Sequence, residues 1–280
     1  MVQVKAYGKI NLTLEVLGLR DDSYHEIRSI MQNIELHDIL SFESSRDEFI
    51  HLSGNNNKLK YDKNNLIYKA AIALKSHTKT AFGANIYLEK NIPIEAGLAG
   101  GSADAAATLK GLNNLWKLDL PMAELLVIGA RIGSDVPFCL LGDTALVEGR
   151  GEKVTDLKSP VMEKLLVVKP DFGASTKLIY QKFDEIFMGN APNYTDQMIK
   201  SIENHGDYKK YLYNDLEMIT TKLYPEVQSI LDTMGEKCEF VMMSGSGPTC
   251  FAFGNDDSIN SLYDTFKAKY VDVYITSFKQ

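Results

Sequence analysis

The chain has 280 residues, of which 45% are apolar and 24% are charged, and it carries a formal net charge of −7 at pH 7. This length and composition are typical of a globular protein with one large domain or two modest ones. The negative charge argues against a nucleic-acid-binding protein that relies on a basic surface. The three cysteines are widely spaced and form neither a disulfide framework nor a paired-cysteine metal site. No apolar run approaches the ~18 residues that cross a bilayer.

The N-terminal segment, residues 2–17, alternates apolar and polar side chains as a β-strand does. The apolar residues at even positions from 10 to 16 face one side, and Lys9 and Asn11 project from the other. We therefore predict a strand with one buried face. A lysine on the polar face of a strand is more often solvated than catalytic. The strand begins without the apolar core of a signal peptide. The three widely spaced thiols favour a reducing cytoplasm.

The next elements follow from the same patterns. A polar loop over residues 18–25 precedes a strand over 29–43, and a second polar loop covers 54–65. A helix over 65–76 and a short strand over 84–89 then lead to a glycine-rich segment.

Residues 93–104 hold three glycines, three alanines and one serine, so this backbone can lie against a ligand. Residues 105–116 repeat apolar side chains with a 3.6-residue period and predict a helix. A glycine-rich loop that opens into a helix N-terminus presents free backbone N–H groups and the positive end of the helix dipole, which suits a polyphosphate. The alternative is a tight connection whose small residues serve packing.

A predicted helix over 121–133 and a strand over 142–147 flank a short motif, G-S-D-V-P-F. The motif places Asp135 between a helix end and an apolar stretch. A carboxylate that enters a partly buried position has a partner or a role. The alternative is a turn aspartate without a chemical role.

We place a domain boundary near residue 158, because the polar stretch over 149–160 has turn residues but no period. The small-residue loop over 244–249 could on its own be a simple connection. The second half is predicted to hold strands over 165–168, 240–243, 250–253 and 271–278 and helices over 175–187, 222–234 and 258–270.

Several familiar motifs are missing. Lys9 follows a glycine but lacks the Ser/Thr and the upstream glycine of a P-loop. The Asp-Phe-Gly at 171–173 has no preceding His-Arg-Asp loop, so it does not indicate a protein kinase. The five histidines form no ligand cluster, and we expect no metal site built by the protein.

Four motifs taken together resemble the GHMP kinases, the small-molecule kinases named for galactose, homoserine, mevalonate and phosphomevalonate. They are the glycine loop, the Lys-Ile-Asn-Leu at 9–12, the Gly-Ser-Asp-Val-Pro at 133–137 and the Gly-Ser-Gly at 245–247. The resemblance runs in order over nearly the whole chain and implies an α+β, two-domain GHMP kinase fold. Its N-terminal domain, 1–158, would be ribosomal-protein-like, and its C-terminal domain, 159–280, would be a ferredoxin-like α/β domain.

Two further motifs are similar to those of one family within this group, the 4-diphosphocytidyl-2-C-methyl-D-erythritol kinases of the non-mevalonate isoprenoid pathway. Residues 20–26 resemble its substrate loop, and residues 214–217 resemble its Asn-Asp-Leu-Glu element. The resemblance implies ATP-dependent phosphorylation of the 2-hydroxyl of the cytidyl substrate.

The resemblance also implies which residues act. Asp135 would accept the proton of the acceptor hydroxyl, and Lys9 would keep that carboxylate ionised and stabilise the developing alkoxide. Mg²⁺ carried with ATP would bridge its phosphate oxygens. The ATP phosphates would lie over Pro93, Ile94, Glu95, Ala96, Gly97, Leu98, Ala99, Gly100, Gly101, Ser102 and Ala103.

The substrate would meet residues from both halves of the chain. Tyr24 and His25 would contact the cytosine by stacking and hydrogen bonding, and Asn11 would contact the erythritol end. The family also has an aromatic residue one turn after a threonine, which closes on the other side of the cytosine. Thr176 and Tyr180, four residues apart on a predicted helix, fit that place.

The sequence departs from the family pattern at two positions. Ser23 stands where the substrate loop usually has glycine, and a serine would be strained there if the position needs a positive φ. Ala103 stands where the phosphate loop usually has a second serine, so one hydroxyl donor is lost. Neither change removes a catalytic group.

Two alternatives stay open at this point. One is a related kinase that acts on homoserine or a mevalonate derivative, for which an aromatic clamp such as Tyr24 would be pointless. The other is a non-catalytic nucleotide-binding or RNA-binding module. We expect small-molecule partners only, ATP and the cytidyl substrate, with no nucleic acid or membrane, and a monomer or homodimer.

Overall fold

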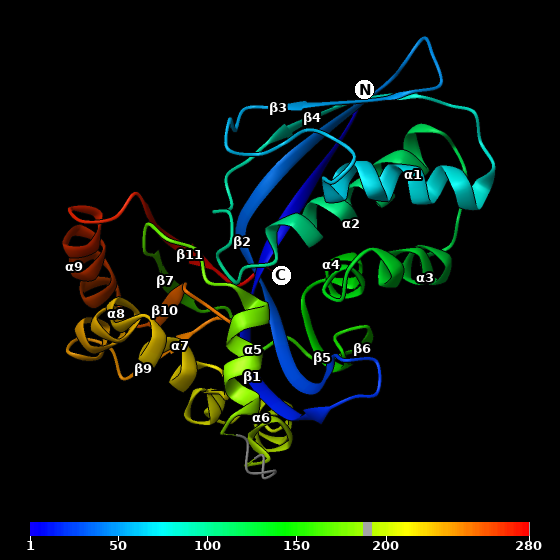
Figure 1. Cartoon of the computed structure of the whole chain (residues 1–280). Helices are drawn as coiled ribbons and strands as arrows, with labels where there is room; N and C mark the ends of the chain where they lie inside the picture. Colours follow the sequence, from blue (N-terminus) through cyan, green and yellow to red (C-terminus); the bar gives the residue numbers. More distant parts are fainter. Residues whose placement is uncertain (187–191, 280) are drawn as a thin grey trace. The chain divides into compact units, whose positions relative to one another are not determined.

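The structure is a computed structural model that describes residues 1–186 and 192–279 (Figure 1). The chain forms two compact units that do not follow the order of the sequence. Unit 1 comprises Met1–Gly8, Leu36–Ile92 and Ala99–Gly142, and unit 2 comprises Lys9–Glu35, Pro93–Leu98 and Asp143–Gln280. The long strands β1 (Val2–Leu19) and β2 (His25–Ser44) contribute residues to both units. The boundary predicted near residue 158 falls inside unit 2 and stays a prediction.

Unit 1 is built on a sheet covered on one face by helices (Figure 1). The C-terminal half of β2 pairs with β4 (Ala84–Glu89) in antiparallel fashion, and β4 pairs with β3 (Ile50–Gly54) in parallel. Strand β4 has the predicted bounds, because its side chains alternate strictly between buried and exposed. The covering helices are α1 (Leu66–Thr78), α2 (Gly100–Leu115), α3 (Met122–Ile132) and α4 (Val136–Leu141).

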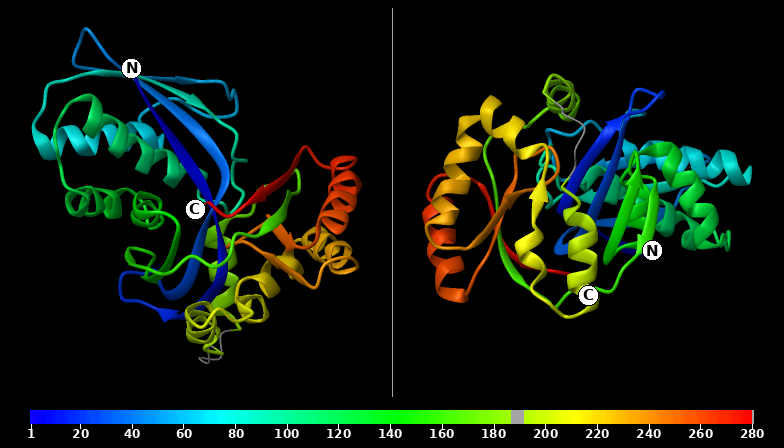
Figure 2. Two further views of the ribbon diagram at one scale, coloured as in Figure 1. Left: turned by 180° about the vertical axis from the view of Figure 1, so that it is seen from behind. Right: turned by 90° about the horizontal axis from the view of Figure 1, so that it is seen from below.

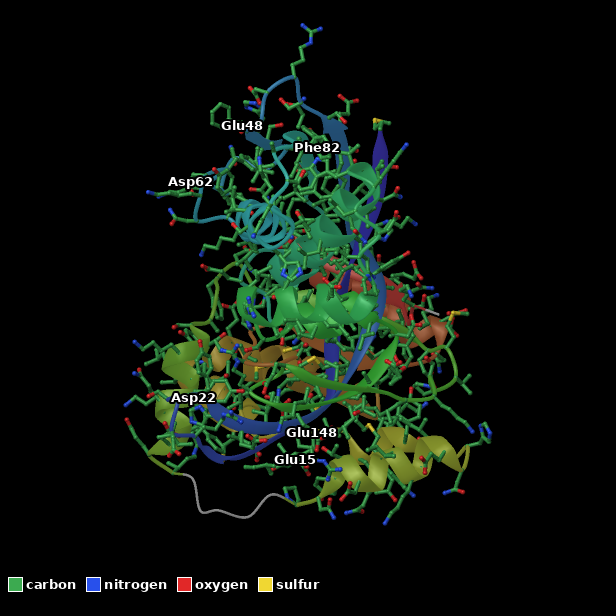
Figure 3. The ribbon with its side chains drawn as sticks, turned by 90° about the vertical axis from the view of Figure 1, so that its right-hand side faces the viewer. Glu15, Asp22, Glu48, Asp62, Phe82 and Glu148 are labelled. Carbon is green, nitrogen blue, oxygen red and sulfur yellow. The ribbon has the colours of Figure 1, made fainter. Side chains whose placement is uncertain are left out.

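The core of unit 1 lies between this sheet and the helices. The ring of Phe42 reaches α2 at Gly111, where any Cβ would overlap it. Trp116, at the end of α2, donates from Nε1 to Gly83 O at 3.3 Å. In Figure 3, Glu48 and Phe82 mark the neighbouring loops at the far end of the same sheet.

Helix α2 begins five residues before the predicted start at 105. Two glycines at the start of a segment favour a loop by propensity, and packing overrides that preference here. A Cβ on Gly100 would lie 2.9 Å from Lys90 Nζ, and a Cβ on Gly101 would lie 3.3 Å from Leu66 Cδ1. These glycines therefore let the first turn of α2 pack closely on its neighbours.

Unit 2 contains an antiparallel sheet in the order β11-β7-β10-β9. Its strands are β7 (Lys164–Lys169), β9 (Phe240–Met243), β10 (Cys250–Phe253) and β11 (Asp272–Ser277). Helices α8 (Pro225–Gly235) and α9 (Asp256–Lys267) lie on one face of this sheet (Figure 2). A β-α-β-β-α-β succession with this strand order is ferredoxin-like, which confirms the predicted C-terminal architecture.

The remaining elements of unit 2 surround the N-terminal strands. Strand β5 (Thr144–Gly149) pairs with the first half of β2, β6 (Lys153–Asp156) pairs with β5, and β8 (Tyr213–Asn214) pairs with β1. Helices α5 (Thr176–Asp184) and α7 (Glu217–Leu223) pack on β1 through apolar side chains. Helix α6 (Tyr194–Glu203) and the 3₁₀ turn η1 (Tyr208–Tyr211) complete the unit.

Some predicted bounds in the second half were wrong. The helix predicted over 222–234 is two helices, because Pro225 starts α8 and the chain turns at Tyr224. The patterns did not predict β3, α4, β6, α6, β8 or α7, which are short or only partly periodic. The last residue of the helix predicted over 175–187 lies outside the described residues.

Candidate functional site

The glycine-rich loop is held in an unusual backbone conformation. Every second residue has a positive φ, at Glu95 (53°), Gly97 (74°) and Ala99 (55°). Only one of the three is a glycine. Glu95 and Ala99 therefore adopt the left-handed conformation although they carry a Cβ atom, which makes that conformation energetically unfavourable. Such strain persists only where the surrounding structure imposes it, and it clusters at ligand sites.

The end of this loop forms the first turn of α2 in unit 1. Ala99 is the N-cap residue of α2, and its side chain makes no capping hydrogen bond to the first turn of the helix. The intrahelical ladder begins with Ala103 N, which donates to Ala99 O at 2.9 Å. The N–H groups of Gly100, Gly101 and Ser102 therefore lack intrahelical acceptors and can serve an anion. Ala103 is buried in the core of unit 1, where its methyl group packs.

The motif around Asp135 lies beside the same turn of α2. A Cβ on Gly133 would be 3.8 Å from Ser102 Oγ, and both residues belong to unit 1. Asp135 follows the end of α3 and precedes α4, and it is half-buried, as the motif predicts. The structure thus brings Ser102 and the segment that carries Asp135 together within unit 1.

Lys9 is buried in unit 2, with 4% of its surface exposed. Its Nζ donates to Asn11 Oδ1 at 2.8 Å and to Gly97 O at 3.1 Å, in the glycine loop. Asn11 in turn donates from Nδ2 to Ser29 Oγ at 2.8 Å. The prediction that only one face of this strand is buried was wrong. Its polar face is also covered, and this is possible because its polar groups are hydrogen-bonded to one another.

A second glycine loop, between β9 and β10, meets this cluster in unit 2. Ser244 Oγ donates to Gly97 O at 3.1 Å, and a Cβ on Gly97 would lie 2.5 Å from Ser244 O. Gly245 has a φ of 58°, and a Cβ added to it would lie 3.5 Å from Lys9 Nζ. Two loops that are distant in sequence therefore surround the Lys9 ammonium.

The Asn-Asp-Leu-Glu element supports this arrangement. Asn214 Nδ2 donates to Met243 O and Gly245 O, both at 2.8 Å. Glu217 Oε2 accepts from Met243 N at 2.8 Å, and Asp215 Oδ2 accepts from Val16 N at 2.7 Å. Burial raises the pKa of both the Glu217 and the Asp215 carboxyl. These side chains fix the second glycine loop and β1, a role that spacing alone did not reveal.

The loop between β1 and β2 presents Tyr24, which is 50% exposed. Ser23 has a φ of 65°, so the position does require the left-handed conformation that glycine adopts freely. Asp22, labelled in Figure 3, accepts from Tyr24 N at 3.1 Å, and this bond and Arg20 lower the pKa of its carboxyl. The Arg150 guanidinium lies 5.0 Å from the centroid of the Tyr24 ring, a cation–π contact that the sequence did not indicate.

His25 is joined to helix α5. Its ring stacks on Tyr180 with centroids 4.5 Å apart, and its Nε2 lies 2.7 Å from Asp184 Oδ1. Thr176, at the start of α5, is hydrogen-bonded through Oγ1 to Ser246 Oγ at 2.8 Å. The structure thus brings His25 and Tyr180 together. The partners Asp184 and Ser246 were not predicted, although Asp184 is four residues after Tyr180 and shares its helix face.

A buried ionic cluster lies at the start of α2 in unit 1. Lys90 Nζ contacts Asp38 Oδ2 and lies 2.9 Å from Asp104 Oδ2. Asp38 also accepts from the backbone N of Asn91 and Ile92, at 2.6 and 2.7 Å. Burial, more than any other cause, raises the pKa of Asp104 to about 8. The cluster ties β2 to the start of α2, and the sequence did not indicate it.

Within residues 1–186 and 192–279, no group of three or more His, Cys, Asp or Glu side chains is arranged to hold a metal ion. In the same residues, no helix combines the length and apolar character that a membrane crossing requires.

Comparisons with known proteins agree with one another. Residues 65–143 match the GHMP kinases N terminal domain, and residues 198–272 match the GHMP kinases C terminal domain. The chain is 43% identical to the 4-diphosphocytidyl-2-C-methyl-D-erythritol kinase of Caldicellulosiruptor saccharolyticus, over 98% of this chain and 96% of that protein. It is 44% identical to the protein of the same name from Clostridium botulinum, over 98% of this chain and 99% of that protein.

A solved structure is similar to this chain over its whole length. The crystal structure of 4-(cytidine 5'-diphospho)-2C-methyl-D-erythritol kinase superposes with a TM-score of 0.82 and 28% identity, and the match covers 99% of each chain. A crystal structure of mevalonate kinase, at 14% identity and a TM-score of 0.76, shares the fold.

Proposed function

The chain belongs to the 4-diphosphocytidyl-2-C-methyl-D-erythritol kinase family of the GHMP kinases, and on that premise we propose its reaction. It transfers the γ-phosphoryl group of ATP to the 2-hydroxyl of 4-diphosphocytidyl-2-C-methyl-D-erythritol, in the non-mevalonate route to isoprenoid precursors. The observation that carries this proposal is the identity of 43–44% to its relatives over 98% of the chain. The buried, hydrogen-bonded Lys9 is consistent with this reaction, because a lysine is rarely buried unless its charge is paired or serves a function.

As a kinase of the GHMP family, the chain uses ATP. We propose that its phosphates lie along residues 93–103, where the first-turn N–H groups of α2 and the hydroxyl of Ser102 would receive them. The left-handed residues of this loop would direct further N–H groups to the phosphates. We propose that Mg²⁺ arrives with ATP, as the membership of the GHMP kinases implies. When bound, it would neutralise phosphate charge.

We assign the chemistry to two side chains. Asp135 accepts the proton of the attacking hydroxyl, which a half-buried carboxylate at the start of a helix can do. Lys9 stabilises the alkoxide that develops on the acceptor oxygen. Its ammonium is already oriented by Asn11 Oδ1 and Gly97 O, so little reorganisation is needed. Asn11 contacts the erythritol end of the substrate from the same strand face.

We assign the cytosine to the aromatic side chains of unit 2. Tyr24 and Tyr180 supply stacking faces, and His25 hydrogen-bonds to the edge of the base. Thr176 joins the start of α5 to the Gly-Ser-Gly loop through its hydrogen bond with Ser246. An aromatic clamp of this kind can stack on a nucleobase, whereas homoserine and mevalonate have no ring on which it could stack.

A phosphoryl-transfer assay with three acceptors tests the proposal. The purified chain is given ATP with the cytidyl substrate, with homoserine or with mevalonate, and ADP release is followed. We expect turnover with the cytidyl substrate alone, and transfer only to homoserine or mevalonate would refute the proposal. Asp135→Asn should reduce kcat by at least about 100-fold and leave ATP binding nearly unchanged. Tyr24→Ala should raise KM for the cytidyl substrate far more than KM for ATP.

We propose three further properties of the chain: its domain division, its location and its partners. The family's two-domain division corresponds to residues 1–158 and 159–280. The enzyme acts in the cytoplasm, in keeping with its three free cysteines. Its partners are small molecules, and it acts as a monomer or homodimer, which gel filtration with light scattering would distinguish.

A further inference from the structure

Asp184 holds the histidine that the proposed function assigns to the nucleobase. It is the last residue of α5, and its Oδ1 lies 2.7 Å from His25 Nε2. The His25 side chain is 10% exposed and that of Asp184 is 41% exposed. Their contact joins segments 159 residues apart in the sequence, both within unit 2.

The contact determines which nitrogen of His25 carries the proton. An ionised carboxylate can only accept hydrogen bonds, so the N–H must be on Nε2. In the neutral imidazole the other nitrogen, Nδ1, then carries a lone pair. His25 is thereby an acceptor on the side of the ring that faces away from Asp184.

The ring is also fixed in orientation. Tyr180 stacks on His25 with an interplanar angle of 29°, and it lies one turn before Asp184 on the same helix. Helix α5 is itself held in place, because Ile179 and Phe183 are buried in the cluster that packs on β1. The imidazole is therefore held at its face by Tyr180 and at its edge by Asp184.

We propose that Asp184 is a positioning residue that makes His25 a hydrogen-bond acceptor and so selects cytosine over uracil. Cytosine presents a 4-amino donor where uracil presents a 4-oxo acceptor. The Nδ1 lone pair accepts from the amino group and repels the carbonyl oxygen. This inference rests on the proposed function only in placing the base beside His25. It concerns the choice between two bases, which can be measured without phosphoryl transfer.

The experiment measures binding of two nucleotides to the full chain by calorimetry, with cytidine 5'-diphosphate and uridine 5'-diphosphate as probes. Asp184→Asn is nearly isosteric, but its amide can donate to Nε2 and so permits the other tautomer of His25. We expect the wild type to prefer the cytidine nucleotide. In the variant this preference should fall by about tenfold, the worth of one hydrogen bond.

Two variants serve as controls. Glu185→Gln removes a neighbouring exposed carboxylate, which pairs with Lys182 instead of His25, and should keep the wild-type preference. Asp184→Glu retains an acceptor-only group and should keep most of it. If Asp184→Asn weakens both nucleotides equally, the residue is only structural and the inference is wrong. Equal binding of both nucleotides by the wild type would also overturn it.

The two proposals fail in different ways. If the wild type prefers the cytidine nucleotide and Asp184→Asn loses that preference, the inference stands even when no phosphoryl transfer is found. If the wild type phosphorylates the cytidyl substrate and Asp184→Asn keeps the full preference, the inference fails and the proposed function stands.

Discussion

Replacing Asp104 by asparagine tests which side chain of the buried cluster at the start of α2 carries a negative charge. Two carboxylates share the Lys90 ammonium, and the three side chains are at most 5% exposed. Asp38 Oδ1 accepts two backbone N–H groups, whereas Asp104 Oδ1 has no hydrogen-bond partner within the described residues. Asp38 is therefore the better-stabilised anion, and Asp104 keeps a proton at neutral pH, as its pKa of about 8 indicates.

The magnitude follows from linkage between proton binding and folding. The pKa of Asp104 is about 8 in the folded chain, against an ordinary value of 3.8. Between these values the folded state binds more protons than the unfolded state, so the free energy of unfolding falls as pH rises. One proton accounts for at most about 1.4 kcal/mol per pH unit, or about 2.7 kcal/mol from pH 5 to pH 7. The loss is complete once the pH exceeds the folded pKa.

The assay is urea denaturation of the wild type and Asp104→Asn at pH 5, 6, 7 and 8. Asparagine mimics the protonated acid and cannot ionise, so the wild type should lose stability relative to the variant with each step in pH. Asp256→Asn, which removes an exposed carboxylate paired with Lys164, is the control and should run parallel to the wild type. Parallel curves for the wild type and Asp104→Asn from pH 5 to pH 8 would show that Asp104 is ionised in the folded state, and the reasoning would be refuted.

Two further substitutions test the packing and the backbone around the site. Lys90→Met leaves the buried Asp38 carboxylate without its counter-ion, and it should lower the free energy of unfolding at pH 7 by about 3–5 kcal/mol. A loss below about 1 kcal/mol in urea denaturation would contradict the cluster's role. Ser23→Gly removes a side chain from a residue with a φ of 65°, and it should raise the stability by about 0.5–1 kcal/mol. A lower melting temperature would argue against strain at this turn.

The sequence predicted elements well where a local period is strong. Strand β4 alternates strictly, and α1 has a side-chain cap at Asn65 that marks its start. The predicted start of α2 was wrong, because close packing at Gly100 overrides the low helix propensity of glycine. Local patterns carry no information about a contact that forms only after folding, such as that of Gly100 with Lys90.

The candidate site was predictable to the same extent. Tyr24, His25 and Asp135 stand in motifs, so a resemblance could name them. The partner of Lys9 at Gly97 is 88 residues away, and that of His25 at Asp184 is 159 residues away. No spacing rule reaches across such separations, and so the burial of Lys9 and the contact of Asp184 with His25 emerge only from the fold.

The position of the transferred phosphate tests the central claim most directly. The acceptor carbon at position 2 of a 2-C-methyl tetritol bears no hydrogen, whereas the other hydroxyl-bearing carbons do. Proton-coupled ³¹P NMR of the product made from ATP and the cytidyl substrate should therefore show one new phosphomonoester signal without splitting by a carbinol proton. A split signal would place the phosphate on another hydroxyl. Release of inorganic phosphate without a phosphorylated product would contradict the assignment of the chain as this kinase.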